Sequence, residues 1–290
     1  MSRLLYKRYL RQEPLSYPDI RPHIHIYQIP LLAHGMQPLL VHLADRVQGA
    51  VMAFGGRYDE KIGKGAYGLS TSAIDKVAED AVLDELDRLK EKLNVLSEEA
   101  GFIDRGGDMT LVLDPVDGTH NAERGLPIYS TSMAIGKDSM ESTTFALVRD
   151  LVSGKTYHAT KGKGAFMDGL RLHVRTFSED DTLFTVYLGI NAHENAYKVA
   201  SRGRRVRSLG AASLDMCIVA SGAADLYYMN TKAKHAELRV VDIAASALIL
   251  REAGGEVVDL NRSKLDMPYH TKATSNLIAY GDPRVMELIP

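Results

Sequence analysis

The chain has 290 residues, enough for one large domain or two closely packed halves, and its formal net charge of −2 argues against a nucleic-acid-binding surface that covers the molecule. Cys217 is the only cysteine, which excludes intramolecular disulfides and cysteine-rich zinc sites. No apolar run is long enough to cross a bilayer, and the N-terminus lacks the pattern of a signal peptide. We therefore expect no nucleic-acid partner, no membrane partner and a cytoplasmic location.

Residues 1–35 have the composition of an irregular N-terminal arm. The segment is rich in arginine, lysine and proline, and only residues 23–27 alternate in the manner of a short strand. His23 and His25 would share one face of that strand, but no third ligand lies nearby in the sequence to complete a metal site. We interpret the segment as an arm that packs on the body of the protein or on a second subunit.

Two helices are predicted next, with a loop between them. Apolar residues recur at helical spacing over residues 38–52 and again over residues 74–89. Ser72 is a natural N-cap for the second helix, and Asp75 lies in its first turn, where the helix dipole favours a carboxylate. The glycine-rich, charged residues 56–70 predict a mobile loop, either a lid over a site or a surface loop without function.

Paired acids follow a short apolar strand in the middle of the chain. Residues 111–113 are apolar and run directly into Asp114-Pro-Val-Asp-Gly-Thr119. Two like charges at the end of a buried strand repel each other and lack solvent, and a hard cation that bridges them is the simplest remedy. Gly118 lets the main chain approach a ligand closely. Taken alone, the stretch also fits a solvated acidic turn.

Further acids occur at the ends of other predicted elements. Glu98 follows a short strand at 94–96, and Asp242 begins a well-patterned helix at 243–253, where a plain N-cap is the simpler interpretation of one acid. Together with Asp114 and Asp117 they form the kind of carboxylate set that holds Mg²⁺ and leaves room for water and phosphate.

The hydroxyl of Thr119 could orient an attacking water, and the backbone N–H groups of Gly118 and Thr119 could hold phosphate oxygens. Two rival interpretations fail. A haloacid-dehalogenase-type phosphatase has one residue between its two aspartates, whereas this chain has two, and the ligand pattern of an EF-hand is absent.

The rest of the chain predicts alternating strands and helices. Strands are expected near 130–135, 144–148, 156–159, 184–188, 225–229, 256–260 and 276–280, and helices over 192–200 and 211–220. Lys161-Gly-Lys-Gly-Ala165 lacks the remaining elements of a P-loop, so a hairpin turn is the better interpretation.

Three separated motifs resemble the inositol monophosphatase family, the Mg²⁺-dependent and lithium-sensitive sugar phosphatases. They are Ser97-Glu98-Glu99, Asp114-Pro-Val-Asp-Gly-Thr119, and Val241-Asp242-Ile-Ala-Ala followed by Glu252-Ala-Gly-Gly255. The motifs occur in the family's order, and the resemblance covers residues 38 to 285. Residues 238–245 look most like the archaeal branch, which combines inositol monophosphatase and fructose-1,6-bisphosphatase activities.

The resemblance implies the architecture. The family fold is of the α+β class, a layered α-β-α-β-α sandwich that usually forms a homodimer. On this chain we expect an N-terminal arm at 1–35, a metal-binding half at 36–180 and a C-terminal half at 181–290, with the two halves packed as one catalytic unit.

The resemblance also implies residue roles. The metal ligands, for two or three Mg²⁺ ions that Mn²⁺ can replace, would be Glu98, Asp114, the carbonyl of Val116, Asp117 and Asp242. The catalytic residues would be Thr119, Glu98 and Asp75, and residues 64–67 match a mobile metal-binding loop. Gly118, Thr119, Gly210 and Ala212 would contact the substrate.

Arg239 is a further candidate for holding the substrate, through a bidentate contact to a second phosphate, with an edge-strand arginine in a surface ion pair as the alternative. Val241 and Ala245 replace the family's usual tryptophan and glycine, which leaves the substrate open. The leading interpretation is a phosphomonoesterase for inositol 1-phosphate and/or fructose 1,6-bisphosphate. The alternatives are a 3′-phosphoadenosine 5′-phosphate or NADP(H) phosphatase and a catalytically silent regulatory relative.

Overall fold

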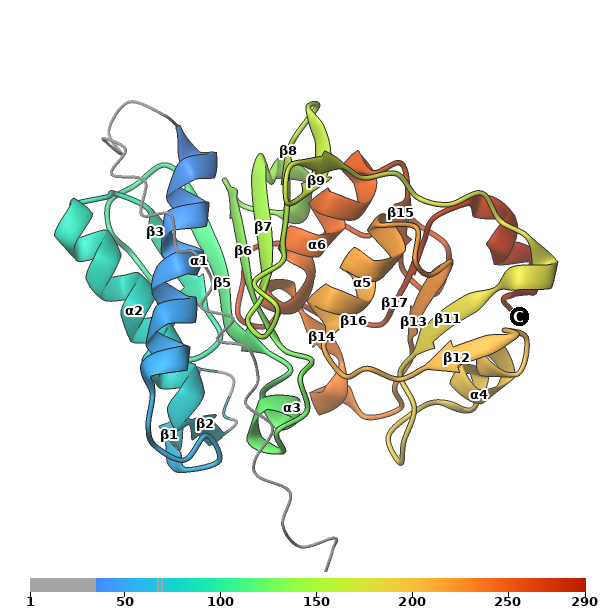
Figure 1. Ribbon diagram of the computed structural model, residues 1–290, viewed down its shortest axis with the longest axis horizontal. Coiled ribbons are helices and arrows are strands. Elements are labelled where there is room, and N and C mark those ends of the chain that lie inside the picture. The colour runs from blue at the N-terminus through green and yellow to red at the C-terminus, as the bar shows by residue number, and fades with distance from the viewer. Residues whose placement is uncertain (1–34, 67, 69) are drawn as a thin grey trace, which may run out of the picture. The chain divides into compact units, whose positions relative to one another are not determined.

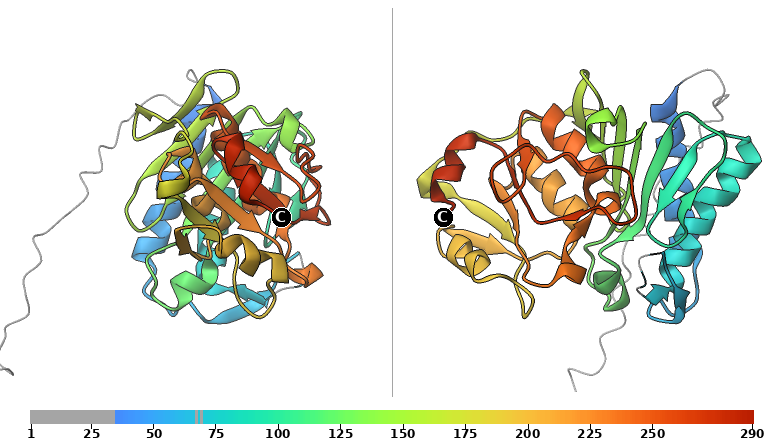
Figure 2. Two further views of the ribbon diagram at one scale, coloured as in Figure 1. Left: turned by 90° about the vertical axis from the view of Figure 1, so that its right-hand side faces the viewer. Right: turned by 180° about the vertical axis from the view of Figure 1, so that it is seen from behind.

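Five layers, alternately helical and sheet, form the part of the chain that the computed structural model describes, residues 35–66, 68 and 70–290 (Figures 1 and 2). The helical layers contain α1 (Met36–Ala53) with α2 (Ala73–Leu89), then α5 (Ala212–Ala220) with α6 (Val240–Glu252), and last α4 (Glu194–Ala200) with the 3-10 helix η5 (Pro283–Leu288). The predicted α-β-α-β-α sandwich of the α+β class is thereby confirmed. None of the described helices has the length and apolar character needed to cross a membrane.

An eight-stranded sheet lies between the first two helical layers, in the order β10-β9-β8-β7-β6-β5-β3-β4. Its strands are β3 (Asn94–Ser97), β4 (Gly101–Ile103), β5 (Thr110–Asp117), β6 (Ser130–Gly136), β7 (Phe145–Asp150), β8 (Thr156–Thr160), β9 (Gly164–Met167) and β10 (Leu170–Arg171). β5 pairs in parallel with β3 and antiparallel with β6. All eight residues of β5 are buried, because α2 covers one face of the sheet and α6 the other.

A five-stranded sheet lies on the other side of α5 and α6, in the order β12-β11-β13-β17-β15. Its strands are β11 (Leu183–Val186), β12 (Arg205–Arg207), β13 (Leu226–Met229), β15 (Glu256–Val258) and β17 (Leu277–Tyr280). Helix α6 is in contact with both sheets, and its residues from Val240 to Leu250 are all buried. A helix between two sheets must be apolar on every side, which explains why its sequence lacks a polar face.

Two sequence-based boundaries near the site were wrong. β5 does not end at Leu113 but continues through Asp117, with a register shift against β6 between Asp114 and Asp117. The proline between them has no N–H to donate to the ladder, which suits an irregular pairing. The segment 56–70 is not a loop throughout, because β1 (Lys61–Lys64) and β2 (Ser70–Ser72) pair as an antiparallel hairpin.

The predicted turn at 161–165 is confirmed as the hairpin between β8 and β9. The Glu252 carboxylate caps it, accepting the backbone N–H groups of Gly162 and Gly164 at 2.7 Å each. The sequence did not predict the short elements α3 (Thr119–Glu123), β14 (Leu238–Arg239) and β16 (Thr274–Ser275). The strand predicted at 23–27, with His23 and His25, lies outside the described residues.

Candidate active site

Three carboxylates converge where β3, β5 and α6 meet. Glu98 directly follows β3, Asp114 lies in β5, and Asp242 lies in the first turn of α6. Because β3 and β5 are parallel neighbours, their carboxyl ends share one edge of the sheet, and the start of α6 lies against that edge. One carboxylate oxygen from each residue lies within 4.8 Å of the others. We call Glu98, Asp114 and Asp242 the acid cluster.

Within the acid cluster, Asp114 is short of hydrogen-bond donors. Burial raises the pKa of Asp114 well above its usual range, and the charges of Glu98 and Asp117 raise it further. Burial also raises the pKa of Glu98, although Arg239 opposes that shift. Within the described part of the chain, the buried Oδ1 atom of Asp114 has no hydrogen-bond partner. A buried carboxylate oxygen without a donor is costly, so the cluster suits a hard cation.

Arg239 lies against the acid cluster rather than on the surface. Its guanidinium hydrogen-bonds Oε1 of Glu98 and lies 2.9 Å from Oδ1 of Asp242, and its side chain is only 17% exposed. Its backbone N–H donates to Oδ2 of Asp242 at 2.8 Å, which fixes the start of α6. The surface ion pair considered from the sequence is therefore wrong, and contact with substrate stays a prediction. A cation would compete with Arg239 for Glu98 and Asp242.

Asp117 lies beside the acid cluster but is bonded to α5. Its Oδ1 accepts the backbone N–H of Ala212 at 3.1 Å, and its Oδ2 accepts the N–H of Ser213 at 2.7 Å and the Ser213 hydroxyl at 2.5 Å. Burial raises the pKa of Asp117 to about 7, and Asp242 adds to the rise while the Ser213 bonds oppose it. The predicted role of Asp117 as a metal ligand stays a prediction, as does the substrate contact of Ala212.

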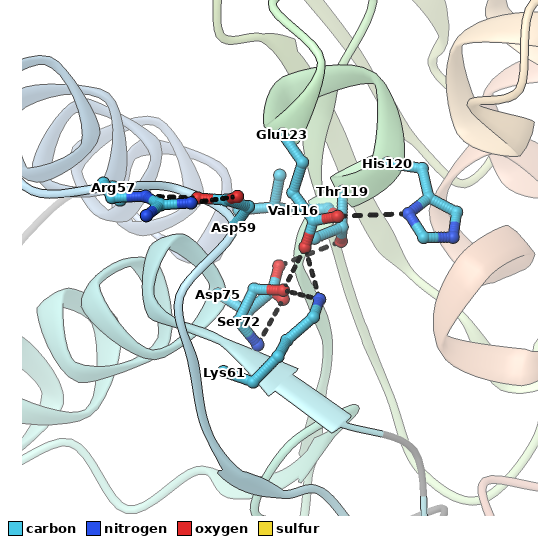
Figure 3. Close-up of polar contacts among 9 residues, drawn as sticks. All are labelled: Arg57, Asp59, Lys61, Ser72, Asp75, Val116, Thr119, His120 and Glu123. Carbon is cyan, nitrogen blue, oxygen red and sulfur yellow. Dashed lines mark hydrogen bonds and ion pairs between the residues drawn. The ribbon is translucent and has the colours of Figure 1, made fainter.

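Thr119 and Asp75 meet at the edge of the same site (Figure 3). The Thr119 hydroxyl lies 3.0 Å from Oδ1 of Asp75 and 2.8 Å from the carbonyl oxygen of Val116, so its single proton can serve one acceptor at a time. Asp75 is in turn held by the backbone N–H of Ser72, at 3.2 Å from its Oδ2. Burial and the nearby Glu98 raise the pKa of Asp75 to about 7.

Gly118 makes the sharp turn from β5 into α3. Its φ is +87°, and a Cβ atom at this position would lie 3.0 Å from the carbonyl oxygen of Ile128 and 3.1 Å from the Cβ of Ala211. Only glycine combines this backbone conformation with this close approach. Gly210, also at positive φ, lies beside Asn121, whose amide donates to the carbonyl of Leu209 at 2.8 Å. The loops before α3 and α5 are thereby joined.

A cleft of about 630 Å³ is lined by all the predicted ligand, catalytic and substrate residues, but not by the described residues of the predicted loop at 64–67. Those in its lining are Asp75, Glu98, Asp114, Val116, Asp117, Gly118, Thr119, Gly210, Ala212, Arg239 and Asp242. The more exposed lining residues Lys61, His120 and Lys234 add basic groups near the mouth. Of the predicted metal-binding loop at 64–67, Tyr67 lies outside the described residues, and the backbone N–H of Ala66 donates to the carbonyl of Glu99 at 2.8 Å.

Sequence reasoning missed several residues of the cleft, among them Lys61, His120, Glu123 and, beyond its role as an N-cap, Ser72. Glu123 follows Thr119 by four residues, so helical spacing could have placed the two on one face of α3. For Lys61 the sequence carries no such signal, because its place depends on the pairing of β1 with β2.

Comparison with known proteins points to one group. The chain matches the inositol monophosphatase family over residues 44–288. It is 33% identical to a fructose-1,6-bisphosphatase/inositol-1-monophosphatase of Methanothermobacter thermautotrophicus, over 86% of this chain and 93% of the relative. It is 31% identical to a bifunctional NADP phosphatase/NAD kinase of Methanococcus maripaludis, over 82% of this chain but 46% of the relative.

The structural match agrees. The crystal structure of an inositol monophosphatase–fructose 1,6-bisphosphatase superposes with a TM-score of 0.79 at 28% identity. The superposition covers 88% of this chain and 98% of the other.

Proposed function

The chain belongs to the inositol monophosphatase family and is a phosphatase, and we propose that it is a Mg²⁺-dependent phosphomonoesterase for inositol 1-phosphate and/or fructose 1,6-bisphosphate. The family membership confirms the resemblance carried by the three sequence motifs. The observation that carries the proposal is the acid cluster at the base of the cleft, with an oxygen of Asp114 that is buried and has no donor among the described residues.

The donor set fits Mg²⁺. Glu98, Asp114 and Asp242 offer hard carboxylate oxygens close together, and we propose that they hold the metal, with Asp117 and the carbonyl of Val116 completing the set. Two or three ions are expected, and Mn²⁺ should substitute. When bound, such ions supply Lewis-acid stabilisation and lower the pKa of a coordinated water.

In this proposal Thr119 and Asp75 position the attacking water. When the Thr119 hydroxyl donates its proton to Oδ1 of Asp75, the lone pairs on Oγ1 are left to accept a proton of that water and fix its orientation. In the metal-free chain burial raises the pKa of Asp75 to about 7. The hydrogen bond between the two residues fixes the position of the Thr119 hydroxyl, the group nearest the water in this proposal.

Other residues of the cleft bind the substrate in this proposal. The backbone N–H groups of Gly118 and Thr119 hold phosphate oxygens, and Gly210 and Ala212 line the sugar side. Arg239 contacts a second anionic group of the substrate. Attack by water in line with the leaving oxygen needs no phosphoenzyme. We also keep two expectations from the sequence, a homodimer and a cytoplasmic location.

A second candidate substrate class is a phosphorylated nucleotide. The relative named as a bifunctional NADP phosphatase/NAD kinase matches most of this chain. NADP(H) or 3′-phosphoadenosine 5′-phosphate would use the same cleft and the same water. A silent regulatory relative is the third alternative, and the acid cluster with Thr119 and Asp75 argues against it, because all the expected acids are present.

Phosphate release in Mg²⁺ tests the proposal. The panel is inositol 1-phosphate, fructose 1,6-bisphosphate, 3′-phosphoadenosine 5′-phosphate and NADP, each with and without Li⁺. We expect Li⁺-sensitive turnover of the first two. A preference for a nucleotide would keep the chemistry and change the substrate. No turnover of any compound while Mg²⁺ still binds would favour the silent relative.

A further inference from the structure

A second polar network lies at the mouth of the cleft, formed by Lys61, Ser72, His120 and Glu123 (Figure 3). We call these four residues the latch. The Glu123 carboxylate is at its centre: Oε1 lies 2.5 Å from Nζ of Lys61 and 2.5 Å from the hydroxyl of Ser72. Lys61 and Ser72 also bond each other at 2.6 Å, and Oε2 of Glu123 lies 3.2 Å from Nδ1 of His120.

The latch joins three elements that are separate in the sequence. Lys61 lies in β1, directly opposite Ser72 in the pairing with β2, and Ser72 is the N-cap residue of α2. Glu123 is the last residue of α3. The contacts of Glu123 with Lys61 and Ser72 therefore connect the hairpin, the start of α2 and the end of α3 at one point.

Helices α2 and α3, which the latch connects, also carry Asp75 and Thr119. Ser72 precedes Asp75 by three residues and donates its backbone N–H to Oδ2 of Asp75. Glu123 follows Thr119 by four residues, one turn along α3. A single hydrogen bond of 3.0 Å between Thr119 and Asp75 cannot by itself fix the angle between α2 and α3. The bond from Ser72 to Glu123 supplies a second link, one turn away.

The latch is built around a charged carboxylate. The Glu123 side chain is only 8% exposed, and burial alone would raise its pKa, but hydrogen bonds from Lys61, Ser72 and His120 lower it overall. Charge-assisted hydrogen bonds of this kind are shorter and stronger than neutral ones. Their loss should therefore loosen the geometry of the pair more than the loss of an exposed ion pair would.

The fold of the hairpin does not depend on the latch. The backbone N–H of Ala73 donates to the carbonyl of Glu60 at 2.8 Å, and the Thr71 hydroxyl hydrogen-bonds the Glu99 carboxylate. β1 and β2 also form their own backbone ladder. Removal of the latch charges should leave these contacts in place and the chain folded.

We propose that Lys61 and Glu123 are positioning residues that keep the Thr119 hydroxyl within hydrogen-bond distance of Asp75. They thereby set the orientation of the attacking water. The inference rests on the proposed function, because it assigns the water to Thr119 and Asp75. Neither residue needs to touch the reacting atoms. Their effect acts through the relative placement of α2, which carries Asp75, and α3, which carries Thr119.

The test compares Lys61→Met and Glu123→Gln with a matched control in the same hairpin region. Arg57 and Asp59 form an exposed ion pair at 2.8 Å. Asp59 lies close enough to Lys61 to feel its charge, but among the described residues it shares no hydrogen bond with the latch, so Asp59→Asn removes a charge and leaves the hydrogen bonds of the latch in place (Figure 3). We expect kcat to fall about tenfold in both latch variants while KM stays within about twofold, since misplaced groups slow the chemical step. Asp59→Asn should retain the parent kcat.

Variants that restore the Lys61–Glu123 ion pair distinguish a positioning role from a general loss of structure. Lys61→Arg keeps a cation that can reach Glu123 and should recover most of kcat, and the charge-reversed pair Lys61→Glu with Glu123→Lys should exceed either reversed single variant. An unchanged kcat in Lys61→Met and Glu123→Gln would overturn the proposal. So would a loss that neither rescue improves.

Amide hydrogen exchange keeps this test separate from that of the proposed function. If the parent chain releases phosphate from none of the substrates, the proposed function fails, and the latch is judged by exchange at residues 70–75 and 119–123. Faster exchange at both segments in Glu123→Gln, but not in Asp59→Asn, would support the link between α2 and α3. Equal exchange in the two variants would overturn it.

Discussion

The acid cluster and the latch line the same cleft, but their carboxylates have different neighbours. In the acid cluster, Asp114 is buried beside two further carboxylates, and burial raises its pKa. In the latch, burial acts in the same direction on Glu123, but three side-chain donors lower its pKa overall. The difference lies in the neighbours, because like charges surround Asp114 whereas Glu123 has a lysine and two further donors.

The comparison shows when a buried acid indicates a metal site. Glu79, also buried, accepts the Ser97 hydroxyl at 2.5 Å and the backbone N–H of Ala100 at 2.9 Å, so it is a satisfied structural carboxylate. Asp114 has an oxygen with no donor among the described residues. Burial alone therefore does not distinguish the two roles, and neither does an oxygen without a donor, which Asp215 and Asp225 also have. Among the described residues, the acid cluster differs because its three carboxylates converge within 4.8 Å of one another.

The largest effect is predicted for a variant that disrupts the acid cluster. Asp242→Asn keeps an oxygen to accept the backbone N–H of Arg239, so α6 should still form, but it removes one negative charge from the site. We expect Mg²⁺ affinity and kcat to fall by more than the roughly 10²-fold typical of losing an outer-shell partner of a metal. Glu79→Gln is the matched control and should bind Mg²⁺ normally in calorimetry. Normal activity in Asp242→Asn would remove the metal assignment.

A smaller loss is predicted for the groups next to the water. Thr119→Ala leaves the acid cluster intact, so Mg²⁺ should bind as in the parent chain while kcat falls by about 10², the scale for losing a positioned catalytic group. Thr119→Ser keeps the hydroxyl and should retain most of the rate. An unchanged kcat in Thr119→Ala would show that the hydroxyl does not orient the water.

The raised pKa values predict how stability depends on pH and metal. In the folded chain burial raises the pKa of Asp75 and of Asp117 from 3.8 to about 7. From about pH 4 to pH 7 the folded state thus holds protons that the unfolded state has released, so the free energy of unfolding of the metal-free protein falls as the pH rises. Mg²⁺ binds the ionised acids, so the rise in the protein's Tm on adding Mg²⁺ should be larger at pH 7.5 than at pH 5. An equal increase at both would contradict this account.

The smallest predicted effect concerns the stability of the latch. Lys61 is nearly half exposed, at 46% of its side chain, so solvent screens its pairing with Glu123. Lys61→Met should lower the free energy of unfolding by about 1 kcal/mol or less, because water weakens an ion pair that has one exposed partner. Urea denaturation measures this change. A much larger loss would mean that the latch maintains the fold as well as the geometry of the site.

The layered fold was predicted from the resemblance to the family, whereas the acid cluster was also predicted for a physical reason. Motifs at strand ends and helix starts, such as Glu98 and Asp242, are local, and the fold brings such ends together. The latch was not predictable in this way. Lys61 reaches Glu123 only because β1 pairs with β2 and the hairpin meets α3, contacts between residues far apart in the chain.

The orientation of Asp117 depends on tertiary contacts in the same manner. Its carboxylate is turned by the first turn of α5, through Ala212 and Ser213, about a hundred residues further along the chain. The extension of β5 to Asp117 likewise follows from burial between α2 and α6 rather than from a strand-like pattern in a segment that contains proline and glycine.

The most direct test of the central claim is a crystal structure of the whole chain grown with Mn²⁺, with anomalous scattering measured at the manganese edge. The account predicts a peak between the carboxylates of Glu98, Asp114 and Asp242, with the Arg239 guanidinium displaced from at least one of them. A well-ordered cluster that binds no Mn²⁺ at millimolar concentration, with Arg239 still bonded to both acids, would contradict it.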